Sequence, residues 1–79
     1  MDNLVNLTEF LVKKLVKEPE LVSVKLYVED EINVIEILVS KDDMGAVIGK
    51  GGNIANSIRV IVRAANKNRE KFKINFESF

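Results

Sequence analysis

The chain has 79 residues, no cysteine and no histidine, and its 12 acidic and 12 basic residues cancel. These counts predict one domain over residues 1–79, without a disulfide framework or a thiolate metal site. The commonest general base is missing and no hydroxyl group has an evident activating base, so we expect no enzyme, no metal and no cofactor. The acidic N-terminus and the lack of a long apolar run indicate no signal peptide and no membrane partner, which favours a cytoplasmic location.

The charged residues are unevenly distributed along the chain. Residues 1–43 carry ten acids and five lysines, a net charge of −5, whereas residues 44–79 carry seven basic residues and two acids, a net charge of +5. No acid lies between Met44 and Arg69. The C-terminal half would therefore attract an anionic partner, although such asymmetry also arises by chance in small domains.

The first predicted element is a helix over residues 2–17. Pro19 lacks the backbone N–H that a continuing helix needs, so the helix is expected to end before it. Apolar residues recur within it at the spacing of a buried helical face. These residues are Leu4, Leu7, Leu11 and Leu15.

Two strands are predicted next, joined by a tight reversal at residues 29–31. Apolar and polar residues alternate over residues 22–28, as they do in a half-buried strand. The second strand has an inner face and an outward face that is not cleanly polar. The inner residues are Ile35, Ile37 and Val39, and the outward ones are Val34, Glu36 and Leu38.

Two helices and a third strand follow. Ser40 and Asp43 have the spacing of a capping box, in which both side chains bond backbone N–H groups at a helix start. A short helix over residues 44–48 would end at Gly49, and a longer one begins near Asn53 and frays near residues 66–68. The buried stripe of the longer helix is predicted to be Ile54, Ile58, Ile61, Val62 and Ala65, and the inner face of the third strand is predicted to be Phe72, Ile74 and Phe76.

The predicted order is therefore α-β-β-α-α-β. Strands and helices that are each apolar on one side bury that side by packing in two layers. We expect an α+β two-layer sandwich, with a three-stranded mixed sheet and three helices on one face of it.

All four glycines of the chain lie between Gly45 and Gly52, beside Lys50. The loop is not a Walker P-loop, because the lysine is followed by glycine rather than Ser or Thr and a helix precedes it. It is not a dinucleotide-binding loop either, since that motif follows a strand and has another spacing. The remaining interpretations are a GxxG loop that binds a ligand and a plain turn between two helices that binds nothing.

The segment MGAVIGKGGNIA resembles the IGxxG core of KH domains, which bind single-stranded RNA or DNA. The order of elements is similar to that of the type II variety. With the length and the run DDMGAVIGKGG, the whole chain is similar to the small bacterial single-KH proteins of the KhpA type. This resemblance implies a single-stranded RNA-binding protein, a post-transcriptional regulator or RNA chaperone. It also implies a homodimer, or a heterodimer with a KhpB (Jag) type RNA-binding protein.

Physical reasons support the same loop. Gly49 and Gly52 leave the main chain open to a sugar–phosphate backbone, Lys50 adds a cation, and the start of the following helix favours phosphate. Apolar residues next to the loop would form the floor of a groove, although each could instead belong to the core, and two arginines would line its rim or remain solvated. The predicted RNA-binding residues are Ile48, Gly49, Lys50, Gly51, Gly52, Asn53, Ala55, Ile58, Arg59 and Arg63.

A second surface is predicted on the longer helix, away from its buried stripe. Val60 and Ala64, with the edge of Ile61, form an apolar patch that would contact a second copy or a partner protein, although single exposed valines are common. Single-stranded DNA remains open as a ligand. The alternative function is a KH-fold protein–protein interaction module with little nucleic-acid binding.

Overall fold

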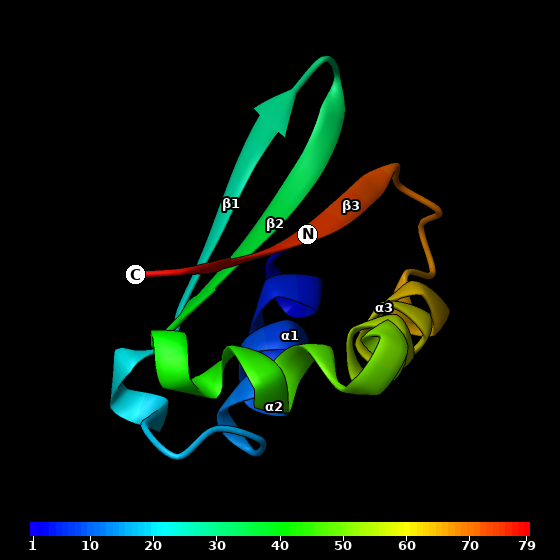
Figure 1. Cartoon of the computed structure of the whole chain (residues 1–79). Helices are drawn as coiled ribbons and strands as arrows, with labels where there is room; N and C mark the ends of the chain where they lie inside the picture. The colour runs from blue at the N-terminus through cyan, green and yellow to red at the C-terminus, as the bar shows by residue number, and fades with distance from the viewer.

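The computed structural model describes all residues 1–79 and has two layers, with the sheet on one side and the helices on the other (Figure 1). Three helices cover one face of a three-stranded sheet, which confirms the predicted fold class. The elements are α1 (Asp2–Lys13), β1 (Ser23–Glu29), β2 (Ile32–Val39), α2 (Met44–Ile48), α3 (Asn53–Ala65) and β3 (Phe72–Ser78). None of the helices combines the length and the apolar content that crossing a membrane requires.

The sheet is mixed and its strand order is β1-β2-β3. β1 pairs antiparallel with β2, and β3 pairs parallel with it, so that Ile35 lies between Leu26 and Ile74. Asp30 and Glu31 both have positive φ angles, 52° and 67°, as in the two-residue turn that best matches the twist of a hairpin. The predicted tight reversal is confirmed.

The core lies between the sheet and the helices. Nine buried apolar residues form one cluster, to which α1, α2, α3, β2 and β3 all contribute. Its members are Leu4, Val12, Ile35, Ile37, Val39, Val47, Ile58, Val62 and Ile74. The predicted inner face of β2 is thus confirmed. Val34, on the opposite face, is also fully buried, because it lies on the central strand between Tyr27 and Lys73, whose longer side chains share that face.

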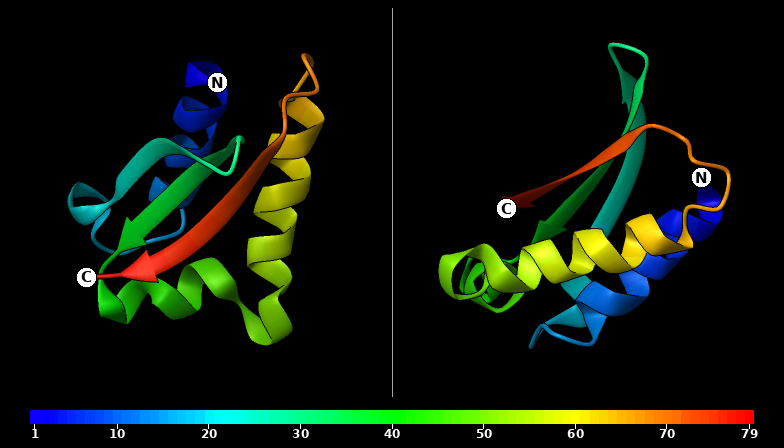
Figure 2. Two further views of the ribbon diagram at one scale, coloured as in Figure 1. Left: turned by 90° about the horizontal axis from the view of Figure 1, so that it is seen from above. Right: turned by 90° about the vertical axis from the view of Figure 1, so that its right-hand side faces the viewer.

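The buried faces of β1 and α3 are shorter than predicted. All residues of β1 from Lys25 to Glu29 are exposed, because the β1–β2 hairpin extends beyond the helical layer (Figure 2). On α3 only Ala55, Ile58 and Val62 are buried, whereas the predicted stripe residues Ile61 and Ala65 are exposed. In both elements the apolar pattern is present as predicted, but it extends beyond the residues that a neighbouring element covers.

The end of α1 is also earlier than predicted, at Lys13 rather than at residue 17. The backbone N–H groups of Lys17 and Glu18 donate to the carboxylate of Asp43, over 3.0 and 3.1 Å, and are therefore lost to a helical ladder. Ser40 Oγ donates to the same carboxylate over 3.1 Å. The predicted capping box is wrong, because neither Ser40 nor Asp43 caps a helix with its side chain. A 3₁₀ turn precedes α2, and Asp43 accepts hydrogen bonds from the segment that follows α1.

These hydrogen bonds change the acidity of Asp43. The backbone N–H of Lys17 has the largest effect in lowering the pKa of the carboxyl group below its ordinary value, and Glu18, Ser40 and the charge of Lys17 act in the same direction. Desolvation acts in the opposite direction, since the residue is buried. The ionised form of Asp43 therefore stabilises the folded state.

We expect Asp43→Asn to destabilise the protein at neutral pH and to matter less in acid. The carboxyl group of an unfolded chain titrates near a pKa of about 3.9, whereas the folded protein keeps Asp43 ionised to lower pH. The stabilisation is complete above the unfolded pKa and is lost as the pH falls through the folded one. Urea unfolding of both proteins as a function of pH measures this. A difference in unfolding free energy that stays constant from neutral to strongly acidic pH would contradict the assignment.

Candidate nucleic-acid interface

The glycine loop joins α2 to α3 through a sharp change of direction (Figure 1). The N–H of Gly49 donates to Gly45 O over 2.9 Å and ends α2, and Gly52 N–H donates to Gly49 O over 3.1 Å. Gly49, Gly51 and Gly52 have positive φ angles of 77°, 63° and 81°. The predicted end of the short helix at Gly49 and the start of the longer one at Asn53 are confirmed.

Gly49 and Gly51 serve different purposes. A Cβ atom on Gly49 would overlap Asn53 Oδ1 and lie 2.6 Å from Cγ1 of Ile54, so the absent side chain lets the loop pack on the first turn of α3. A Cβ atom on Gly51 would meet nothing within 4 Å. Gly49 therefore fixes the shape of the loop, while Gly51 leaves open space at its exposed tip.

The tip of the loop combines two features that favour an anion. Lys50 is exposed and takes part in no salt bridge or side-chain hydrogen bond of the protein. Gly52 occupies the N-cap of α3, and no side chain caps that end of the helix. The positive end of the dipole of a 13-residue helix thus lies beside a free ammonium group. Asn53, the first residue of α3, is exposed at the same place.

The three predicted floor residues differ in accessibility. Ile48 is half-buried and packs against the edge of the core. Ala55 is only 2% exposed and Ile58, a member of the core cluster, only 3%. Of the three, Ile48 offers a ligand the most surface.

Arg59 connects α3 to β3. Its Nη2 donates to the backbone oxygen of Ile74 over 3.2 Å, its Nη1 donates to Asn56 Oδ1 over 3.3 Å, and the guanidinium carbon lies 5.2 Å from the centre of the Phe76 ring. Sequence reasoning placed Arg59 at phosphates along the rim of a groove and had no signal for these contacts. The structure places the side chain between the helix and the edge of the sheet.

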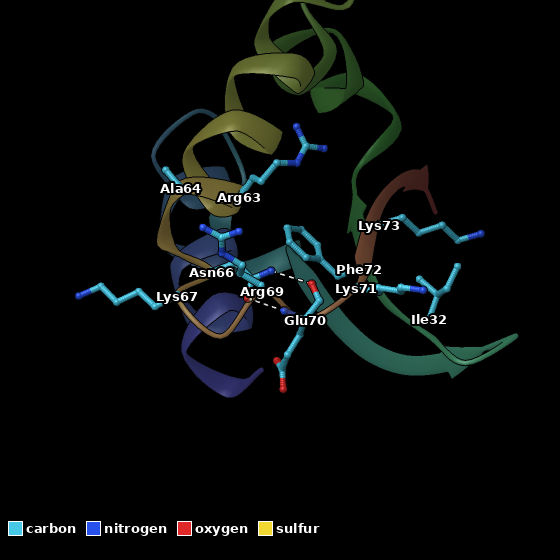
Figure 3. Close-up of a pocket in the computed structure, with 10 residues that line it drawn as sticks. All are labelled: Ile32, Arg63, Ala64, Asn66, Lys67, Arg69, Glu70, Lys71, Phe72 and Lys73. Atoms are coloured by element: carbon cyan, nitrogen blue, oxygen red, sulfur yellow. Dashed lines mark hydrogen bonds between the residues drawn. The ribbon is translucent and has the colours of Figure 1, made fainter.

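Arg63, one turn further along α3, lies in a basic pocket that we call the distal groove (Figure 3). The groove has a volume of about 800 Å³ and lies between the C-terminal part of α3, the α3–β3 loop and the start of β3. Five cations and one acid are among its lining residues. These are Arg63, Lys67, Arg69, Lys71, Lys73 and Glu70.

The backbone of Glu70 is tied to the side chain of Asn66, which shapes the loop beside the groove. Asn66 Nδ2 donates to Glu70 O over 2.7 Å, and Glu70 N–H donates to Asn66 Oδ1 over 3.2 Å (Figure 3). The RNA-binding residues predicted from the sequence include none of the cations that follow α3, which are Lys67, Arg69, Lys71 and Lys73. The available signal was the density of cations over residues 67–73.

The glycine loop and the distal groove lie at opposite ends of α3. With a rise of 1.5 Å per residue, 13 helical residues separate them by about 20 Å. α3 therefore has a cation and a helix N-terminus at its first end and a group of cations at its last end. Positive groups at both ends of one helix suit an extended polyanion.

An α-β-β-α-α-β chain with a GxxG loop between two helices that cover a mixed sheet is a type II KH domain. The family model described as "KhpA/KhpB, KH domain" matches residues 5–77. The chain therefore belongs to the KhpA/KhpB KH-domain family.

Curated relatives agree with this membership. The chain is 48% identical over 59 residues to "RNA-binding protein KhpA" of Clostridium perfringens. The aligned residues are 75% of the chain and 79% of that protein. The chain is 43% identical over 65 residues to the protein of the same name from Listeria monocytogenes, covering 81% and 86%. The Thermotoga maritima protein of that name is 38% identical over 58 residues, covering 73% and 77%. The family is one of RNA-binding proteins rather than enzymes.

Two glycine-to-alanine substitutions should have opposite effects on stability. Gly49→Ala places a Cβ atom against Asn53 and Ile54 at a backbone conformation (φ 77°, ψ 173°) that is essentially restricted to glycine, so we expect a loss of about 2 kcal/mol or more. Gly45→Ala is the matched control, because the position is helical and has free space around it. It should raise stability by about 0.5–1 kcal/mol. Urea unfolding measures both, and equal stabilities would refute this account of the loop.

Proposed function

We propose that the protein binds single-stranded RNA and that the loop of residues 49–52 clamps the sugar–phosphate backbone. The observation that carries this proposal is the exposed tip of the loop, where Lys50 has no internal partner and Gly51 has free space around it, next to an uncapped helix N-terminus. The names of the KhpA relatives, "RNA-binding protein", support the same ligand. A cytoplasmic post-transcriptional regulator or RNA chaperone is the role that we propose for it.

The bound strand would run from the glycine loop along α3 towards the distal groove. Lys50 and the backbone of the loop hold phosphates at one end, as KH loops do for about four nucleotides. Arg63 lies near the C-terminal end of α3 and lines the distal groove, so it would hold a phosphate at that end of the path. The hydrogen bond from Arg59 to Ile74 holds β3 next to α3. The side chain of Arg59 would thus form part of the wall of the path. Ile48 and Asn53 would contact the strand at the start of this path, and the buried Ala55 and Ile58 would support them from the core.

Base recognition would not depend on an aromatic platform. Of the five aromatic residues, Phe10 and Phe79 are exposed outside the proposed path, and Tyr27 lies on the edge strand β1. Phe72 is half-buried and lines the distal groove, so it offers a single ring at that end of the path rather than a platform. Phe76 lies beneath the guanidinium of Arg59. The width of the path and polar contacts would therefore provide the selectivity, and single-stranded DNA would compete unless the 2′-hydroxyl is recognised.

The double variant Lys50→Asp/Gly51→Asp should bind RNA at least about tenfold more weakly, because two carboxylates would face phosphates. The control is Lys50→Asn/Gly51→Asn, which has similar side chains without charge, and Asn tolerates the positive φ of position 51. The control lacks the charge of Lys50, so it should make about one phosphate contact fewer. The slope of the logarithm of its affinity against the logarithm of the salt concentration should therefore be shallower by about 0.7. Fluorescence anisotropy with a labelled single-stranded RNA at several salt concentrations measures both. Equal affinities of all three proteins would remove the loop from the mechanism.

The chain also has an apolar surface that fits a protein partner. Val60 is 60% exposed and Ile61 is 46% exposed, and Ala64 lies on the same exposed part of α3. A loop that holds about four nucleotides binds weakly, and joining two such modules raises avidity. We therefore propose that this patch contacts a second RNA-binding chain, either another copy or a KhpB (Jag) type protein. A pure protein-interaction module would use the patch without binding RNA.

Val60→Glu should abolish the complex that this patch forms, since it buries a carboxylate against apolar side chains. Sedimentation velocity, on the chain alone and mixed with a KhpB-type protein, measures the mass. Asn6→Glu serves as the control, because Asn6 is exposed on α1 and not on the helix that carries the patch. Unchanged masses in both experiments would refute the patch.

A further inference from the structure

The free edge of β1 has no partner in the chain, since β1 pairs only with β2. Its residues 25–29, Lys-Leu-Tyr-Val-Glu, are all exposed, and the hairpin that carries them stands clear of the helices (Figures 1 and 2). Monomeric proteins protect such edges with prolines, bulges, charges or a covering element. The β1 edge has no proline and no bulge, and its charges are one lysine and one glutamate.

The turn determines which backbone groups of β1 are free. Glu29 and Ile32 are register partners and close a two-residue turn, so they exchange both of their hydrogen bonds. Every second residue of β1, counted back from Glu29, likewise bonds to β2. The N–H and C=O groups of Leu26 and Val28 therefore point to the free edge, where an added antiparallel strand would pair with them.

We propose that the added strand is the β1 strand of a second copy, related by a twofold axis at Tyr27. In this register Leu26 of each copy lies opposite Val28 of the other, and these two pairs use the free backbone groups identified above. On the outer face, Lys25 of each copy lies opposite Glu29 of the other. The segment KLYVE is thus complementary to itself in backbone hydrogen bonds, apolar side chains and charge.

Other registers lose this complementarity. Because only Leu26, Val28 and other even-numbered residues offer free groups, the strands can slide only in steps that keep these residues opposite each other. A shift of the second strand by one such step in one direction places Tyr27 of one copy opposite Lys25 of the other. A shift in the other direction places Tyr27 opposite Glu29 of the other copy. Both steps separate Lys25 from Glu29, so the register centred on Tyr27 is the one that pairs these opposite charges.

The dimer would have a continuous six-stranded sheet with both helical layers on one side. β3, the glycine loop and the α3 patch all lie away from the β1 edge, so the paired edge leaves them accessible (Figure 1). The inference does not depend on RNA binding. A contact of five residues per strand belongs with the small interfaces, below about 1,200 Å², that form weak complexes, so the dimer should dissociate on dilution.

Cysteine cross-linking tests the twofold register directly, because the chain has no cysteine of its own. Tyr27→Cys places two cysteines opposite each other at a non-hydrogen-bonded pair, about 4.5 Å apart between Cα atoms, which suits a disulfide. Lys25→Cys is the matched control, since its two copies would lie about 13 Å apart. We expect a covalent dimer of the first variant only, under mild oxidation. No dimer, or equal dimer in both variants, would overturn the proposal.

Charge exchange tests the ion pairs. In sedimentation experiments over a range of concentrations, Lys25→Glu and Glu29→Lys should each raise the dissociation constant of the dimer by about threefold to tenfold, and the double variant should restore it. Within one chain the exchange is unfavourable, because Glu29 lies 3.4 Å from Lys73 and Lys25 lies opposite Glu36. Recovery in the double variant therefore cannot come from a more stable fold. A wild-type monomer at every concentration, a lack of recovery, or a homodimer that Val60→Glu alone abolishes would each overturn the proposal.

Discussion

The carboxylate of Asp43 holds the arrangement of this small domain together. It accepts hydrogen bonds from the backbone of Lys17 and Glu18 and from Ser40, and so ties the segment after α1 to the turn before α2. Without it, two N–H groups at this junction would lose their partner, and the position of α2 against the core would depend on Val47 and a few half-buried contacts. Since α2 leads directly into the glycine loop, the direction in which that loop faces solvent depends on a buried acid six residues before Gly49.

The loop shows how one short motif divides two tasks between its glycines. Gly49 contacts the protein itself and allows the loop to lie on the first turn of α3. Gly51 has free space around it, Lys50 makes no salt bridge, and both are exposed on the surface that a ligand would meet. The main chain of the loop is held in one conformation by its packing on α3. Binding of a strand would therefore cost little conformational entropy of the loop. The charge of the chain follows the same division, with the acidic half contributing β1, β2 and α1 and the basic half contributing the loop and α3.

Much of the fold could be predicted because its signals are local. The alternation in β2 and β3, the helical spacing in α1 and α3, and the glycine loop are each readable within a few residues. The errors concern interactions across the chain. α1 ends at Lys13 because of Asp43, 26 residues beyond Lys17, and no local pattern encodes this contact. Ile61 and Ala65 fit the helical stripe, but no other element covers them. The distal groove and the contact of Arg59 with Ile74 exist only once α3 and β3 lie side by side.

The contact between Arg59 and Ile74 also bears on how far copies of the chain can assemble. β3 is the other outer strand of the sheet, and there the guanidinium occupies the Ile74 carbonyl and covers the Phe76 ring. An incoming strand would have to displace a charged side chain from this border, whereas nothing obstructs β1. Growth by strand addition would thus be possible on one side only, and association through it would stop at a closed pair. Arg59 would thereby oppose the growth of a continuous sheet, and so of fibres, through β3.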